Sequence, residues 1–220
     1  DTRALFVYID YSLSPGAKYP QPLDDCYAVY RYVNQGRLGV KPTSIVLVAE
    51  SNGGALAAGV CMRAIEHGIR VPDGLVLGYP VLSLEDSLTP SRVLFMMDPV
   101  VPMNLIRQCR SAYLPKSQTD GYSRDPYASP LLAPSSILAK FPPTDIMVGG
   151  FDPFLDDSIH FAQRLTAAGV RCRLRRFKRA PHAFWCFQPT LSEAREGISL
   201  AGEWIQSYFL WEPIEPHRRA

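Results

Sequence analysis

Short runs of apolar, β-branched and aromatic residues alternate along the chain with longer segments in which apolar residues recur every three or four positions. The short runs predict β-strands, and the longer segments predict amphipathic helices. The predicted strands cover residues 5–11, 44–49, 74–79, 144–149 and 172–177. Most of them are apolar on both faces, as expected for a sheet that is covered by helices on both sides. The order of elements therefore predicts an α/β fold with a mostly parallel sheet flanked by helices.

Four helices are predicted between and after these strands. The first includes residues 23–33, and Asp24 and Asp25 place negative charge in its first turn, where it suits the helix dipole. The others cover residues 53–67, 157–168 and 191–210. Gly68 and Gly169 follow two of these helices and are typical C-terminal caps.

The stretch from about residue 83 to residue 134 interrupts this alternation. It is rich in proline and carries an apolar patch at residues 93–97. We interpret it as an inserted cap or lid, since the pliable Met and Phe side chains of the patch suit a wall that holds an acyl chain. A loop-rich part of the core fits the pattern equally well, because the same side chains fill ordinary gaps in a core.

Length and composition predict one domain. The chain has 220 residues, of which 47% are hydrophobic and 20% are charged, and this is enough for one sizeable core and too little for two. The formal net charge of +2 argues against nucleic acid as a partner, because phosphate binding needs a concentrated positive face. A small-molecule or lipid substrate is the better expectation.

The cysteines bear on the cellular compartment. The five cysteines are scattered and never form a Cys-x-x-Cys pair, so neither a disulfide framework nor a metal site is predicted. A reducing compartment fits best, and we expect a cytoplasmic protein, with the lipid-droplet surface as a further location. No run of residues approaches the roughly 18 apolar residues of a membrane-spanning helix. The chain opens at Asp1 and soon enters an apolar strand, which suggests a region of a longer protein.

The sequence Glu50-Ser51-Asn52-Gly53-Gly54 lies between a predicted strand and a predicted helix, the context of a nucleophile elbow. In this motif a serine is held on a sharp turn, and small neighbours allow the helix to pack closely. Ala49 replaces the first glycine of the usual Gly-x-Ser-x-Gly pattern. Ser51 is therefore the candidate nucleophile, and the backbone N–H of Asn52 is a candidate oxyanion donor. A Ser-Gly turn without chemistry fits the same residues.

An acid and a histidine follow in the order that this chemistry requires. Asp152 comes just after the predicted strand 144–149, and His182 comes after the predicted strand 172–177, within Pro181-His182-Ala183-Phe184. We expect His182 to act as general base and then general acid, and Asp152 to fix the imidazole tautomer. The other three histidines are expected to be structural or solvated. Asp156 and Asp157 are expected to start a helix, where carboxylates are favourable.

These motifs resemble those of the hormone-sensitive lipase family of α/β-hydrolases. The matching blocks cover residues 10–26, 50–54, 152–157 and 181–184, and residues 125–134 look closer to the eukaryotic members than to the bacterial esterases. The resemblance implies hydrolysis of acyl esters such as acylglycerols, without a cofactor, by Ser51, Asp152 and His182.

The largest departure from the family pattern is an absence. The family places a His-Gly-Gly-Gly loop upstream of the strand that corresponds to residues 5–11, and residues 1–220 contain no such loop. The first strands of the family's sheet are missing as well. Loss of one oxyanion donor typically costs on the order of a hundred- to a thousandfold in rate. We therefore expect activity in the complete parent protein, with the missing N-terminal part as a partner of this segment.

Basic residues crowd the last predicted strand and its exit, at positions 171, 173, 175, 176, 178 and 179. A peripheral contact with a lipid surface is one interpretation. Charge that protects an edge strand from further pairing is the better one. Two functional alternatives also stay open: another acyl hydrolase, such as a peptidase or thioesterase, and a non-catalytic ligand-binding module on the same fold.

Overall fold

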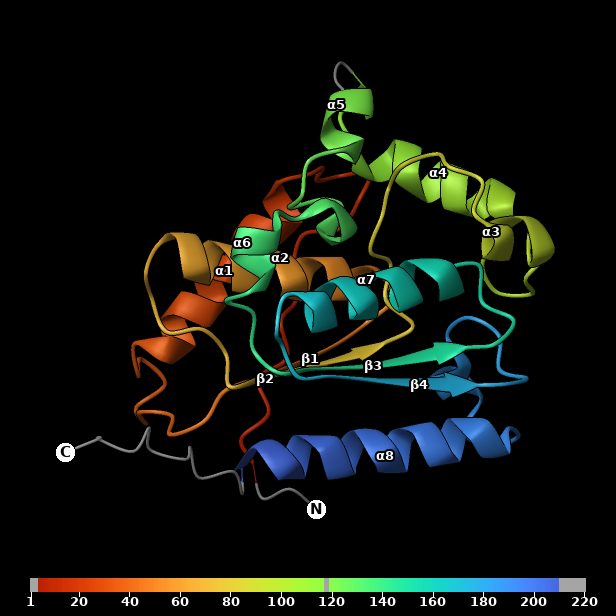
Figure 1. Cartoon of the computed structure of the whole chain (residues 1–220). Helices are drawn as coiled ribbons and strands as arrows, with labels where there is room; N and C mark the ends of the chain where they lie inside the picture. The colour runs from red at the N-terminus through yellow and green to blue at the C-terminus, as the bar shows by residue number, and fades with distance from the viewer. Residues whose placement is uncertain (1–3, 117–118, 210–220) are drawn as a thin grey trace.

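Four parallel strands form the sheet of this chain in a computed structural model, which describes residues 4–116 and 119–209. The strands are β1 (Val46–Glu50), β2 (Gly74–Gly78), β3 (Thr144–Gly149) and β4 (Cys172–Phe177), and each pairs with the next in this order. Helices cover both faces of the sheet (Figure 1). The predicted α/β class with a parallel sheet is confirmed.

The main helices lie close to their predicted positions. They are α1 (Gln21–Asn34), α2 (Asn52–Glu66), α7 (Leu155–Ala167) and α8 (Ser192–Phe209). Helix α7 begins two residues earlier than predicted, and Leu210, the predicted end of the last helix, lies outside the described residues. In the part of the chain that the structure describes, no helix combines the length and the apolar character needed to cross a bilayer.

The central strands bury both of their faces. Leu75 and Leu77 of β2 belong to the core between the sheet and helices α2 and α7, whereas Val76 belongs to the core under α8. Successive side chains of a strand point to opposite faces, so a strand between two helical layers is apolar at most positions. Asp145 of β3 is a buried exception, and it is paired with Arg173. Figure 1 shows α2 and α7 on one side of the sheet and α8 on the other. Because all four strands run parallel, their carboxyl ends lie together at one end of the sheet.

The predicted first strand, residues 5–11, is wrong for this structure. The segment has no strand geometry and enters no ladder with β1. Leu5, Phe6 and Tyr8 are largely exposed, and only Ile9 and Tyr11 pack against a core cluster. A strand is stabilised by a hydrogen-bonded neighbour and by burial of alternate side chains. Residues 5–8 have neither, so the apolar pattern alone does not order them into the sheet.

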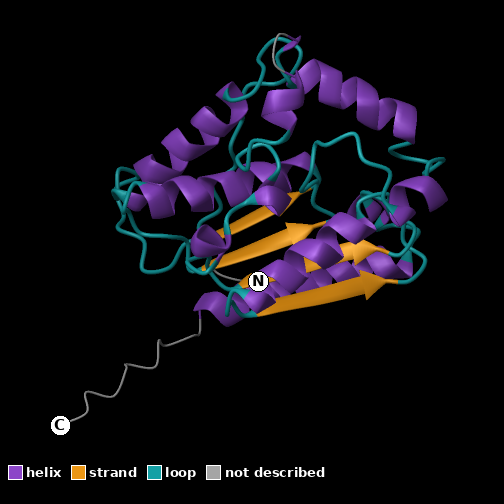
Figure 2. Ribbon diagram, turned by 45° about the horizontal axis from the view of Figure 1, so that its top comes forward, coloured by secondary structure: helices purple, strands orange, loops and turns teal. Residues whose placement is uncertain are grey.

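The stretch from residue 83 to residue 134 contains short helices between β2 and β3. They are α3 (Pro90–Leu94), α4 (Met103–Tyr113), α5 (Thr119–Ser123) and the 3-10 helix η2 (Pro130–Leu132); α6 (Ser135–Leu138) follows. Residues 117 and 118 lie outside the described residues. Helices α3, α4 and α5 lie on the same side of the sheet as α2 and α7 and farther from it (Figures 1 and 2). This position is compatible with the proposed cap, which remains our interpretation of the stretch.

The basic strand β4 is at the edge of the four-stranded sheet, as the charge pattern predicts. Its charges have acidic partners within the chain. Arg173 binds both carboxylate oxygens of Asp145 at 2.6 Å, and Arg175 pairs with Glu196 at 2.6 Å. Arg179 also pairs with Glu193 at 3.5 Å, so three of the six basic residues have acidic partners within the protein itself.

Candidate active site

Ser51 occupies a strained turn between β1 and α2. Its backbone has φ 51° and ψ −127°, in a region that residues with a Cβ rarely adopt. Three hydrogen bonds hold this turn: the Ser51 N–H donates to the Gly78 carbonyl at 3.0 Å, and the Ser51 carbonyl accepts from Gly54 at 3.0 Å and from Val81 at 2.9 Å. The turn therefore presents the Ser51 hydroxyl from the end of the sheet, as a nucleophile elbow does.

Of the two glycines after Ser51, only Gly54 is required by close packing. A Cβ at Gly54 would lie 2.5 Å from the Pro80 Cβ and 3.1 Å from the Pro80 Cα, which is too close for real atoms. A Cβ at Gly53 would lie 3.7 Å from the Ala49 Cβ, an ordinary contact. The methyl group of Ala49 is thus accommodated beside the elbow.

We expect Gly54→Ala to lower the free energy of unfolding by about 1–3 kcal/mol, because the added methyl group must displace the backbone at Pro80. The matched variant Gly53→Ala should leave stability unchanged or raise it by up to about 1 kcal/mol, since its methyl group would make only an ordinary contact with Ala49 and alanine favours a helix more than glycine does. Urea unfolding followed by tryptophan fluorescence measures both. Equal effects of the two substitutions would contradict the role assigned to the Gly54–Pro80 contact.

The structure brings Ser51, His182 and Asp152 together. The Ser51 Oγ lies 2.9 Å from the His182 Nε2, and the His182 Nδ1 lies 2.9 Å from the Asp152 Oδ2. Asp152 follows β3 and His182 follows β4, so three parallel strands deliver the three side chains to one edge of the sheet. Asp152 and His182 are both almost fully buried. The chain of contacts allows a proton to move from the serine to a histidine that a carboxylate orients.

The Asp152 carboxylate is enclosed and fully engaged. Its Oδ1 accepts a hydrogen bond from the Phe154 N–H at 2.8 Å, and its Oδ2 faces the His182 ring. Burial raises the pKa of the Asp152 carboxyl, whereas the bond to His182 lowers it. The two hydrogen bonds fix the rotation of the carboxylate and thereby the direction in which it holds the imidazole.

Aromatic rings enclose the His182 imidazole. Tyr79 and Phe154 pack against it edge to face, with ring centroids 5.2 Å and 5.3 Å away. The Tyr79 hydroxyl donates a short hydrogen bond to Glu50, the residue before Ser51, and burial raises the Tyr79 pKa. Tyr79 therefore links the position of the imidazole to the elbow. Tyr79 ends the predicted strand 74–79, but the hydrophobic pattern gave no reason to assign it a role at the site.

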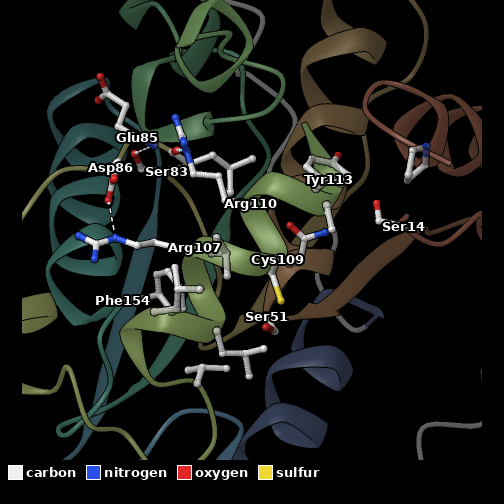
Figure 3. Close-up of a pocket in the computed structure, with 18 of the residues that line it drawn as sticks. Ser14, Ser51, Ser83, Glu85, Asp86, Arg107, Cys109, Arg110, Tyr113 and Phe154 are labelled. Carbon is white, nitrogen blue, oxygen red and sulfur yellow. Dashed lines mark hydrogen bonds and ion pairs between the residues drawn. The ribbon is translucent and has the colours of Figure 1, made fainter. Parts of the chain in front are cut away.

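A mostly apolar pocket of about 360 Å³ opens beside Ser51. Met103, Ile106 and Cys109 of α4 contribute to its wall, and Phe154 lines it near the triad. Figure 3 shows Ser51 and Cys109 among the residues that line the pocket, together with the charged residues Asp86 and Arg107. The volume and the apolar lining suit a small organic ligand with a hydrocarbon part.

The Asn52 N–H is available for the oxyanion role by its position in the chain. Helix α2 begins at Asn52, so this N–H belongs to the first turn, where amides have no partner within the helix. The partial positive charge of the helix N-terminus favours a developing negative charge beside Ser51.

A buried ion pair fastens α3 to the start of α7. The Arg92 guanidinium lies 2.7 Å from the Asp157 Oδ2, and both side chains are only 2% exposed. Burial raises the pKa of the Asp157 carboxyl to about 6, against the effect of Arg92. Asp156 accepts a hydrogen bond from the Ser91 N–H at 2.7 Å. Asp156 and Asp157 are in the first turn of α7, as predicted, and they also hold the neighbouring segment.

The remaining histidines lie away from the triad or outside the described residues. His67 ends α2 and hydrogen-bonds through Nδ1 with the Tyr27 hydroxyl at 2.7 Å, and His160 is exposed on α7. His217 lies outside the described residues. Two buried residues near the triad were not predicted from the sequence, Arg92 and Asp98. A Pro-rich stretch gives no local signal that its charged residues will be buried.

The fold and the arrangement around Ser51 define an α/β-hydrolase. The model of the family described as alpha/beta hydrolase fold matches residues 1–186, and the chain belongs to this family. The chain is 40% identical to hormone-sensitive lipase of Mus musculus over 119 residues, which are 53% of this chain and 16% of that protein. It is 27% identical to an esterase of Acinetobacter venetianus over 208 residues, which are 94% of this chain and 65% of that protein.

Solved structures agree with these relatives. The esterase of Pyrobaculum calidifontis superposes with a TM-score of 0.84 at 31% identity, over 92% of this chain and 65% of that chain. The chain thus spans less than two thirds of each of these relatives. The resemblance to the hormone-sensitive lipase family, predicted from the motifs, is confirmed.

Proposed function

We propose that this chain is the catalytic part of a serine carboxylic-ester hydrolase that forms an acyl-enzyme. The observation that carries the proposal is the continuous contact from the Ser51 Oγ through His182 to Asp152, with 2.9 Å at each step. The names of the relatives, esterases and a lipase, point to the same reaction class. The apolar pocket beside Ser51 supports acyl esters, acylglycerols among them, as the substrate class.

In this mechanism the Ser51 Oγ attacks the ester carbonyl while His182 Nε2 takes the hydroxyl proton. The Asn52 N–H binds the oxyanion of the tetrahedral intermediate. When the carbon–oxygen bond to the alcohol breaks, His182 returns its proton to the leaving oxygen. Water then attacks the acyl-enzyme with the same histidine as base, which releases the carboxylic acid and restores Ser51. Asp152 keeps the imidazole Nδ1–H directed toward its carboxylate during both acylation and deacylation.

We propose that the second oxyanion donor comes from a His-Gly-Gly-Gly loop outside residues 1–220. That loop would be a partner of this chain within the full-length protein. We also propose the cytoplasm as the location and a peripheral contact with lipid surfaces. The internal pairing of Arg173 and Arg175 makes β4 a weak candidate for that contact.

The proposal is tested on the full-length protein that includes this chain. A fluorophosphonate probe should label Ser51, and p-nitrophenyl esters from acetyl to palmitoyl should be hydrolysed at rates that depend on acyl length. Amides and thioesters with the same acyl groups are assayed beside the esters. Faster turnover of amides or thioesters would replace the ester hydrolase with another acyl hydrolase. Neither labelling nor turnover in a folded protein would instead favour a ligand-binding module.

A further inference from the structure

Asp98 is a buried carboxylate that the mechanism above does not use. It follows α3 in the stretch between β2 and β3, and only 4% of its surface is exposed. Its Oδ1 accepts hydrogen bonds from Val100 N–H at 2.8 Å and Val101 N–H at 2.7 Å, which closes a local turn. Its Oδ2 accepts a hydrogen bond from the His182 N–H at 3.1 Å, across 84 residues of sequence. One side chain therefore joins a turn beside the pocket to the backbone of His182.

Burying a carboxylate is costly unless hydrogen bonds replace its hydration. Among the ion pairs between described residues, none includes Asp98. Three backbone N–H groups that donate to its carboxylate therefore take the place of most of its hydration. A local turn needs an acceptor only at Oδ1. The hydrogen bond between Oδ2 and the His182 N–H is thus a separate interaction. An aspartate has a second oxygen for it, whereas a serine has one hydroxyl oxygen and could not accept this bond in addition to the turn bonds.

The His182 backbone needs support from outside its own loop. It lies between β4 and the 3-10 helix η3 (Phe184–Phe187), and the next residue, Ala183, has a positive φ of 53°. Asp152 and the rings of Tyr79 and Phe154 fix the imidazole, but they do not fix the backbone from which it projects. A backbone shift would move Nε2 relative to the Ser51 Oγ, and misplacement by about 1 Å can cost on the order of a hundredfold in rate.

We propose that Asp98 is a positioning residue for His182: by holding the His182 amide, it sets the distance between Nε2 and the Ser51 Oγ. The inference rests on the proposed function, because it gives a role in the same reaction to a residue of the segment between β2 and β3. Asp98 touches neither Ser51 nor the imidazole ring in any of its hydrogen bonds. Its influence on the reaction passes through the His182 backbone.

The isosteric variant Asp98→Asn tests this role in the full-length protein. An asparagine has one carbonyl oxygen and one NH2 group, so it can serve the turn or the His182 N–H but not both. We expect kcat per titrated active site to fall on the order of ten- to a hundredfold, with KM changed by less than about twofold. Active sites are counted by fluorophosphonate labelling carried to completion, so loss of folded protein does not enter kcat. The matched control is Glu196→Gln, which removes an exposed carboxylate on α8.

An unchanged kcat per active site in a folded Asp98→Asn protein would overturn the proposal, as would a loss confined to KM. If this variant does not fold, hydrogen exchange of the His182 amide in the unmodified protein decides. Slow exchange supports the bond to Asp98, and exchange at the rate of an unstructured peptide overturns it. Absence of labelling and turnover in the unmodified protein would refute the proposed function instead, and the exchange measurement would still report on the Asp98 contact.

Discussion

Ser51→Ala should abolish fluorophosphonate labelling of the full-length protein and lower kcat for ester hydrolysis on the order of 10⁵- to 10⁶-fold. The reason is that alanine removes the Oγ that forms the acyl-enzyme in the proposed mechanism, while the His182 and Asp152 side chains keep the hydrogen bond between them. Some rate above that of water should persist, because the oxyanion donors and the pocket still bind the substrate. The measurement is p-nitrophenyl ester turnover at saturating substrate, together with probe labelling on a gel.

Ser192→Ala is the matched control for this substitution. Ser192 starts α8, and its hydroxyl hydrogen-bonds to the neighbouring Glu193, so its loss should leave labelling and kcat unchanged. Persistent labelling of the Ser51→Ala protein, at another serine, would show that the elbow is not the nucleophile.

Asp152→Asn should lower kcat on the order of ten-thousandfold while the protein remains folded. An asparagine can donate a hydrogen bond from its NH2 group to His182 Nδ1, and this favours the tautomer that carries its proton on Nε2. That nitrogen then cannot accept the Ser51 proton. KM should change little, because Asp152 faces the imidazole and the Phe154 N–H. Stopped-flow acylation rates in the variant would place the loss in the attack step.

The variant Asp156→Asn, in the first turn of α7, distinguishes the role of Asp156 from that of Asp152. Asp156 binds the Ser91 N–H at the start of α3, so its loss should affect stability more than kcat. A larger loss of kcat in Asp156→Asn than in Asp152→Asn would reverse the assignment of the acid.

Most of the fold follows from local patterns. Strand β2 and residues 146–148 of β3 are apolar at successive positions, and helices α2 and α7 end next to glycines with positive φ, Gly68 and Gly169. Such signals depend on neighbours in the sequence and can therefore be recognised without a structure. The segment 5–11 has the same apolar pattern, but a strand also needs a partner for its backbone, and no pattern within the segment reports on that.

Helix α4 was also not predicted, although a signal for it exists. Met103, Ile106, Arg110 and Tyr113 recur at helical spacing, and the prolines at positions 99 and 102 obscured this period. The proximity of Ser51, Asp152 and His182 could be predicted, because each of these residues follows a strand that is easily recognised in the sequence. Asp98 and Arg92 could not, because they lie in the Pro-rich stretch between β2 and β3, where no recognised strand fixes their position relative to their partners, His182 and Asp157.

The contacts of residues 91–98 have a consequence for protein engineering. Ser91 and Arg92 bond to residues 153–157, and Asp98 bonds to His182, whereas the pocket wall on α4 begins only after Pro102. In the proposed function, residues 91–98 therefore align the reacting groups, and α4 supplies much of the pocket wall that contacts the substrate. Grafting a foreign α4 at Pro102 would exchange the pocket wall and leave the alignment intact, so new substrate ranges could be obtained without rebuilding the chemistry.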